Sequence, residues 1–481
     1  MYIFLFLLLG FFLRIINIDK PEGLWNDEYV SWYVASVPFL KGFWQEVFKQ
    51  CHMPLYYLYL KPFVNFNDIV LRFTSVIPSV LSIPVMYQVG KFFSKRTALI
   101  CAGITTISPF LVYYSQEVRF YSLLFLFSAI SLYYLLKIKY KNRGWFGYIL
   151  SVFLIIFTHV LGIFYVTLST CYLCYQKKFF SKKIIFFVIL SLFLVMPWGI
   201  NILKMLPSSQ WWGIFSYTNI LFLFSDYLSP ILTNNVNSPA NFFYSNNIIF
   251  NILLLVPTII GVGAVINGIK KAKGLFFIFM ANVIILIILA IAGKIVFITK
   301  YTIEILPILI LLFALGIRNK KGYSCLIVYV FMLLSSVYTP FYPAKVFRSE
   351  GHKLVADILN KIKSDKIIFT YYEPNRFYRY LDDKNNLYHI SKINRFEYLV
   401  NPKNILYNVK KDERVSIVFL DSVSFIPENY IEIAKRRNLP EMFITFSEIR
   451  NELQKEVANN YSDIKMYENG SWIVVSAKKL K

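Results

Sequence analysis

The stretch that decides the fold is "TALICAGITTISPFLVYYSQEVRFYSLLFLFSAISLYYLL", residues 97–136. It contains two apolar runs, 97–114 and 119–136, joined by a turn of a few residues. Each run is about long enough to cross a hydrocarbon core of roughly 30 Å as a helix. Basic segments flank the stretch at 91–96 ("KFFSKR") and 137–143 ("KIKYKNR"). Because basic loops favour the cytoplasmic side, the stretch predicts a transmembrane hairpin whose turn lies outside.

The same pattern extends over most of the chain, which has 481 residues and is 57% hydrophobic. Three more basic segments, at 176–183, 270–273 and 318–321, separate apolar runs. Between two cytoplasmic loops the chain crosses an even number of times, so residues 145–175 are expected to form two short helices that turn near His159. We therefore predict a polytopic α-helical membrane protein with about eleven spans and a cytoplasmic N-terminus. The spans are expected near 2–18, 67–90, 97–114, 119–136, 145–158, 160–175, 184–203, 247–267, 275–293, 301–317 and 322–338.

The composition changes near residue 340. Residues 340–481 are charged and alternate short strand-like runs such as "SIVFLD" and "SWIVVSAK" with helical stretches. This pattern predicts a small extracytoplasmic α/β domain, while residues 1–339 form the transmembrane domain with long outer loops at 19–66 and 204–246. The formal net charge of +24 does not indicate nucleic-acid binding, because most of the basic excess lies in the membrane part, where it orients loops.

Acidic residues are scarce before residue 340, and all nine are expected outside or near the outer membrane face: Asp19, Glu22, Asp27, Glu28, Glu46, Asp68, Glu117, Asp226 and Glu304. A carboxylate at a membrane interface costs free energy unless it is solvated, paired or used. Asp27 and Glu28 follow Asn26, a good N-cap residue, and begin an aromatic stretch that predicts an interfacial helix. They either complement the helix dipole or supply a general base.

Further polar residues are expected at the same face. Glu117 and Arg119 share the tight turn, as a local ion pair or as part of a site. His52 and His159 are candidates for structural groups, metal ligands or acid/base groups. The cations of Arg72 and Lys300, the latter followed by Tyr301, are suited to an anionic headgroup, especially phosphate, and snorkelling is the alternative for either.

These motifs together resemble the GT-C membrane glycosyltransferases of the protein O-mannosyltransferase and lipid A aminoarabinose transferase kind. The resemblance is carried by "NDE" (26–28), "HMPLYY" (52–57), "SQEVRFYS" (115–122), "THVLG" (158–162) and "KYTIEILPIL" (300–309), and it covers roughly residues 1–339. It implies a sugar donor on a polyprenyl or dolichyl phosphate. The sequence departs from the family where "HMP" replaces His-Pro-Pro and "KY" replaces Arg-Tyr.

The resemblance implies a role for each candidate residue. Asp27 would be the catalytic base, and Glu28 and Glu117 would orient the acceptor or hold a divalent metal ion where one is used. Arg119, Arg72 and Lys300, with Tyr301, would hold the donor phosphate. His52 and His159 stay candidates for substrate or metal contacts, and no cofactor is implied with certainty.

The sequence thus predicts an enzyme of the cell membrane that moves a sugar from polyprenyl phosphate to an envelope protein, lipid or polysaccharide, with inversion at the sugar carbon. A transporter or flippase of a lipid-linked saccharide is one alternative. It predicts ionisable residues in mid-span, whereas here they cluster at one face. A non-catalytic, sugar-binding envelope protein is the other alternative.

Overall fold

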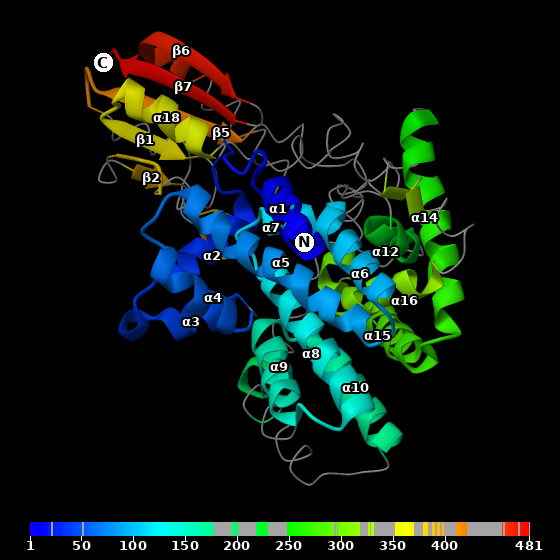
Figure 1. The fold of residues 1–481 in the computed structure, drawn as a ribbon. Helices are drawn as coiled ribbons and strands as arrows, with labels where there is room; N and C mark the ends of the chain where they lie inside the picture. Colours follow the sequence, from blue (N-terminus) through cyan, green and yellow to red (C-terminus); the bar gives the residue numbers. More distant parts are fainter. Residues whose placement is uncertain are drawn as a thin grey trace. The chain divides into compact units, whose positions relative to one another are not determined.

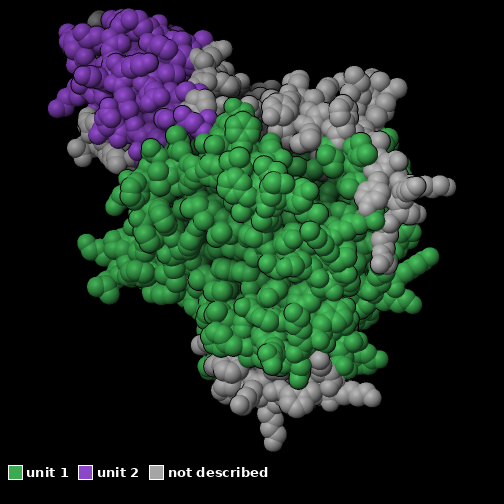
Figure 2. Space-filling model, viewed as in Figure 1, with its two compact units in different colours: residues 1–18, 30–347 green, residues 19–29, 348–481 purple. Residues whose placement is uncertain are grey.

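The computed structural model describes residues 1–20, 23–50, 52–177, 193, 196–200, 218–228, 248–292, 295, 297–317, 326–327, 329–330, 352–369, 379–382, 387–389, 392–394, 397–398, 410–420, 455, 457–469 and 472–480. The chain forms two compact units, coloured separately in Figure 2. One comprises residues 1–18 and 30–347, and the other comprises residues 19–29 and 348–481. Most of the spans predicted at 184–203 and 322–338, and the boundary at residue 340, lie outside the described residues.

The first unit is helical (Figure 1). Its longer helices are α1 (Tyr2–Ile15), α5 (Asp68–Lys91), α6 (Lys95–Ile107), α8 (Tyr121–Lys141), α9 (Trp145–Thr158), α10 (Gly162–Lys177), α12 (Thr218–Leu228), α14 (Ile248–Ile269), α15 (Lys273–Ile291) and α16 (Leu306–Gly316). Shorter elements are α3 (Phe43–Lys49), α4 (Leu55–Leu60), α7 (Pro109–Ser115) and the 3₁₀ helices η1 (Phe39–Lys41), η2 (Lys61–Phe63) and η4 (Thr299–Ile305). Helix α2 (Asn26–Ser36) begins in the second unit and ends in the first.

Four described helical segments are long and apolar enough to cross a membrane, or five if the bent pair α6–α7 is one span. They are α5, α8, α15 and the continuous segment η4–α16. The structure therefore supports a multi-pass membrane protein, and the total of eleven spans stays a prediction. The expected helix pair at 145–175 is confirmed, because α9 ends at Thr158 and α10 begins at Gly162.

The span predicted as one helix at 97–114 is broken, which corrects the sequence expectation. Helices α6 and α7 meet at an angle of 52°. Ser108 lies at the break, where its hydroxyl accepts a hydrogen bond from the amide of Leu111 at 3.4 Å. Pro109 begins α7 and has no amide hydrogen, so the carbonyl of Thr105 loses its helical donor. The break therefore leaves polar backbone groups inside the helical unit.

Arg14 of α1 supplies the missing donors. Its side chain is fully buried, and its guanidinium donates to the carbonyl of Thr105 at 2.9 Å and to that of Thr106 at 3.0 Å. Its Nε donates to the hydroxyl of Ser79 on α5 at 2.7 Å. A single buried cation thus joins α1 and α5 to the end of α6, and these bonds offset the cost of removing its charge from water.

The second unit contains a mixed five-stranded sheet with the order β2-β1-β5-β7-β6. Its strands are β1 (Lys366–Phe369), β2 (Leu387–His389), β5 (Arg414–Leu420), β6 (Tyr461–Asn469) and β7 (Trp472–Lys479). Strand β1 pairs in parallel with β2 and β5, whereas β7 is antiparallel to β5 and β6. A separate two-stranded pair joins β3 (Lys392–Asn394) and β4 (Glu397–Tyr398). Helix α18 (His352–Ile362) buries Val355, Ala356 and Leu359 in the core cluster that includes Ile367, Val418 and Val474 of the sheet.

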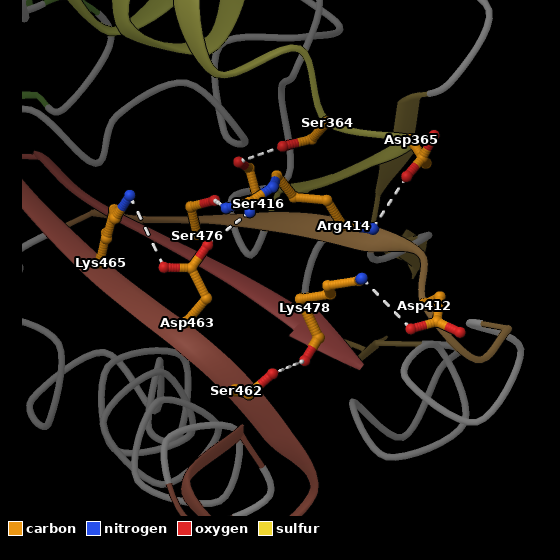
Figure 3. A network of polar contacts seen from close by, with 10 residues as sticks. All are labelled: Ser364, Asp365, Asp412, Arg414, Ser416, Ser462, Asp463, Lys465, Ser476 and Lys478. Carbon is orange, nitrogen blue, oxygen red and sulfur yellow. Dashed lines mark hydrogen bonds and ion pairs between the residues drawn. The ribbon is translucent and has the colours of Figure 1, made fainter. Parts of the chain in front are cut away.

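Polar contacts connect the strands of this sheet, as Figure 3 shows. Arg414 of β5 donates to the carboxylate of Asp463 on β6 at 2.5 Å and to the hydroxyl of Ser476 on β7 at 3.4 Å. Its amide donates to Asp365 at 2.8 Å, and the hydroxyls of Ser364 and Ser416 lie 2.7 Å apart. Because Arg414 contacts three chain segments, this network serves the register of the sheet.

Candidate functional site

The turn that joins α7 to α8 carries two of the predicted site residues. The amide of Arg119 donates to the carbonyl of Glu117 at 2.7 Å, which closes a tight turn. The side-chain amide of Gln116 donates to the carbonyl of Ile16, beyond the end of α1, at 2.7 Å. The hydroxyl of Ser75 on α5 donates to the carbonyl of Arg119 at 3.2 Å. The turn is therefore anchored on two other segments, and its two charged side chains are buried.

Arg119 extends from this turn towards α2. Its Nη1 donates to the hydroxyl of Ser31 at 3.1 Å, and its guanidinium carbon lies 5.3 Å from the centre of the Phe120 ring. Only 3% of Arg119 is exposed, so a hydroxyl and an aromatic face replace water around the cation. A guanidinium held in this way keeps further N–H donors in a fixed plane, which suits a phosphate.

Phe120 is the centre of a group of rings that we call the Phe120 cluster: Phe120, His52, Tyr56, Tyr121, His159 and Tyr301. The ring of His159 is stacked on Phe120, with centroids 4.7 Å apart and planes 21° apart. Tyr301 stacks on His159 in turn, at 5.8 Å and 17°. The rings of His52, Tyr56 and Tyr121 lie 5.9, 6.4 and 4.5 Å from that of Phe120. Residues from four separate stretches of the first unit are thereby brought together.

Lys300 adds a second cation beside this cluster. Its amine lies 5.3 Å from the ring centre of Tyr301 and 5.8 Å from that of Tyr121. Lys300 is 9% exposed and belongs to η4, whose 3₁₀ geometry is interrupted by a kink at Thr302. The cluster thus has Arg119 against one ring and Lys300 against two others, so an anion there would meet cations from separate elements.

The two histidines differ in their surroundings. His52 is half-buried, and its Nδ1 lies 2.7 Å from the hydroxyl of Tyr57. Burial and the nearby charge of Arg119 lower the pKa of His159 from 6.5 to about 3, so this ring is neutral near pH 7. No group of three or more His, Cys, Asp or Glu side chains suited to a metal ion occurs in the part of the chain that the structure describes. A cation at His159 would also be repelled by Arg119.

Arg72 contacts the backbone that follows α1. It is fully buried on α5, and its Nη1 donates to the carbonyl of Ile18 at 3.1 Å. That carbonyl follows α1, so this contact fixes the path of the chain as it leaves the helix.

The two neighbouring acids in the first turn of α2 have different geometries. The amide of Tyr29 donates to the carbonyl of Trp25 at 2.8 Å, which makes Trp25 the N-cap, one residue before the expected Asn26. Glu28 is fully buried, and its carboxylate accepts a hydrogen bond from the amide of Trp25 at 3.2 Å. This is the reciprocal half of a capping box. Asp27 is partly exposed at the second helical position, so the capping contact belongs to Glu28.

Sequence reasoning missed four residues of this site: Tyr56, Tyr121, Phe120 and Ser31. Phe120 stands directly after Arg119 in "SQEVRFYS", but nothing distinguishes it from the 46 phenylalanines of the chain. Ser31 interrupts the aromatic stretch "YVSWYV", and a buried hydroxyl among aromatics needs a polar partner. That interruption was the available signal.

The comparisons with known proteins bear on the whole chain. Residues 55–200 match the family model described as dolichyl-phosphate-mannose-protein mannosyltransferase. The crystal structure of ArnT from Cupriavidus metallidurans bound to undecaprenyl phosphate is similar over 99% of this chain and 98% of that chain, with a TM-score of 0.55 and 11% identity. The same protein in the apo state gives a TM-score of 0.52 and 11% identity, over 99% and 97% of the two chains. A search of curated protein sequences finds no match.

Proposed function

We propose that the chain is a membrane glycosyltransferase of the GT-C kind, similar to the protein mannosyltransferases and ArnT, and that it transfers a sugar from a polyprenyl-phosphate donor to an envelope acceptor. The acceptor would be a protein, lipid or polysaccharide at the outer face of the membrane. One observation carries the proposal. Arg119, Phe120 and His159 lie inside the segment that matches the family model, and Phe120 contacts both of the other two.

The cations supply what the leaving group requires. Cleavage of the bond between the sugar carbon and the phosphate oxygen leaves a second negative charge on polyprenyl phosphate. Arg119 and Lys300, each held against aromatic rings, are assigned to stabilise that charge, and the hydroxyl of Tyr301 adds a donor. The neutral ring of His159 separates Phe120 from Tyr301 and places no third charge between the two cations.

Asp27 is assigned as the general base. It accepts the proton of the acceptor hydroxyl, whose oxygen attacks the sugar carbon while the bond to phosphate breaks on the opposite side. The sugar carbon is inverted and polyprenyl phosphate leaves. Glu28 keeps the first turn of α2 in place through its bond to Trp25, so its role is positional. Glu117 is assigned to hold the turn or to orient the acceptor, and Arg72 to position the chain after α1.

The test follows the release of free polyprenyl phosphate by purified protein in nanodiscs, supplied with a series of polyprenyl-phosphate sugars and candidate acceptors. Asp27→Asn is expected to abolish transfer while donor binding persists. Arg143→Gln, an exposed residue after α8, is the matched control and is expected to retain activity. Equal release by wild type and Asp27→Asn would remove Asp27 from the chemistry. No release with any donor and acceptor would favour the transporter.

A further inference from the structure

The chain just before α2 is held by residues 348–481 of the second unit, which we call the C-terminal unit. The amide of Leu24 donates to the hydroxyl of Tyr380 at 2.7 Å, and Leu24 is 1% exposed. Gly23 has a φ of +85°, and a Cβ there would lie 2.7 Å from the Tyr380 hydroxyl and 2.8 Å from Cβ of Lys353. Residues 19–29 therefore pack with residues 348–481 as one compact unit.

The backbone at Tyr380 is held in place by two hydrogen bonds to one side chain of α18. The side chain of Asn360 on α18 donates to the carbonyl of Tyr380 at 2.9 Å and accepts from the amide of Asp382 at 3.1 Å. The ring of Tyr380 packs against the core cluster that contains Leu359 and Leu381. The hydroxyl that accepts the Leu24 amide is thus carried by the folded core of the C-terminal unit, on a short segment clamped by α18.

The hydrogen bond from Leu24 to Tyr380 lies next to the capping hydrogen bond of α2. Two successive backbone amides have side-chain acceptors, since that of Leu24 donates to Tyr380 and that of Trp25 donates to Glu28. Asp27 is two residues beyond Trp25 and directly precedes Glu28. Any shift of the backbone at Leu24 is therefore passed to the turn that carries Asp27 within a single helical turn.

We propose that Tyr380 is a positioning residue for Asp27, and that the C-terminal unit serves to fix the acid-bearing first turn of α2. The inference rests on the proposed function, in which Asp27 is the base. It gives the C-terminal unit a part in the chemical step that is separate from any recognition of the acceptor. The hold acts through one hydroxyl group, so it can be removed without changing the packing of the ring.

The test compares Tyr380→Phe with Tyr467→Phe in the full-length protein. Tyr467 of β6 packs against the same core cluster, so it is a matched control for the loss of a tyrosine hydroxyl. Hydrogen exchange is measured at Leu24 without substrate, and kcat and donor KM are measured for sugar transfer. Tyr380→Phe is expected to speed exchange at Leu24 by roughly tenfold or more and to lower kcat by about tenfold with donor KM unchanged. Tyr467→Phe should leave all three unchanged.

Gly23→Ala is a second variant that disturbs the same contact from the other side, because its Cβ meets the Tyr380 hydroxyl. It should give the same pattern if Tyr380→Phe fails to fold. Unchanged exchange at Leu24, or faster exchange with unchanged kcat, would overturn the inference. If the wild-type protein transfers no sugar, the proposed function fails. The contact between Tyr380 and Leu24 is still tested in that case, because hydrogen exchange at Leu24 is measured independently of activity.

Discussion

The guanidinium of Arg119 donates a hydrogen bond to the hydroxyl of Ser31 over 3.1 Å. The two residues are 88 positions apart in the sequence. Arg119 belongs to the turn between α7 and α8, whereas Ser31 belongs to α2, the helix whose first turn contains Asp27. The contact therefore ties the cation assigned to the donor phosphate to the helix that carries the proposed base.

Arg119→Lys is expected to lower kcat/KM for the donor by roughly 10- to 100-fold, which corresponds to the loss of one or two charge-assisted hydrogen bonds. A lysine keeps the charge but has no planar fork, so it cannot donate to Ser31 while keeping further donors in a fixed plane beside Phe120. Ser31→Ala should cost about 3- to 10-fold, because the arginine loses a single neutral partner. Initial rates of polyprenyl-phosphate release measure both effects. Wild-type activity in Arg119→Lys would show that the fork is not used.

Helices α14 and α16 approach each other at two reciprocal glycines. A Cβ at Gly268 of α14 would overlap the carbonyl of Leu312, and one at Gly316 would overlap the carbonyl of Ala264. Close backbone contact of this kind supplies the packing that holds membrane helices together. We expect Gly268→Ala to destabilise the fold by about 1–3 kcal/mol, because the helices must separate.

Gly263, on the same helix, is the matched control. A Cβ at Gly263 would meet no atom within 4 Å. Gly263→Ala should leave stability unchanged or raise it by up to about 1 kcal/mol through better helix propensity. Thermal unfolding in detergent compares the two variants, and equal effects would show that the overlap at Gly268 is relieved at no cost.

The helical part of the fold could be predicted largely from charge and hydropathy. The pair α9–α10 is a clear case, because the basic segments at both ends of 145–175 require an even number of crossings, and the helices indeed turn at His159. The break between α6 and α7 was missed, although Ser108 and Pro109 are a familiar helix-start pair. A long apolar run masks such a local signal.

The site could be predicted less completely. Polar residues stand out in an apolar sequence, so Arg119, His159 and Lys300 were candidates, and the structure brings all three to the Phe120 cluster. Phe120 was missed, since aromatic residues are common in this sequence and one more does not stand out. The strand β6 was missed for a related reason: Ile464 and Met466 are exposed, so the strand lacks a continuous apolar face. Its place in the sheet depends on pairing with β7, which no local pattern contains.

Arg14→Met is expected to destabilise the protein by about 2–4 kcal/mol, because it leaves the carbonyls of Thr105 and Thr106 buried without their donor. Pro109 has no amide hydrogen to offer in its place. Arg143→Met, at an exposed position, removes the same charge and should change stability by less than about 0.5 kcal/mol. Unfolding in detergent measures the difference, and equal stability would mean that water replaces the guanidinium.

His159→Phe is expected to make stability less dependent on pH. The folded pKa of His159 is about 3, below the value near 6.5 of an unfolded chain. The contribution of His159 to the free energy of unfolding is therefore fully present above pH 6.5 and is lost as the pH falls from 6.5 towards 3. In that range the unfolded chain binds a proton that the folded ring does not bind. The slope approaches about 1.4 kcal/mol per pH unit in that window.

Phenylalanine keeps the stacking on Phe120 and Tyr301 but has no proton to gain. Thermal unfolding of both proteins between pH 5 and 8 should therefore give parallel curves above about pH 7 and a steeper fall for wild type below about 6.5. The difference should reach about 2 kcal/mol near pH 5. Curves that stay parallel down to pH 5 would mean that His159 takes up its proton in the folded protein as readily as in the unfolded one, and its part as a neutral spacer between the two cations would then fail.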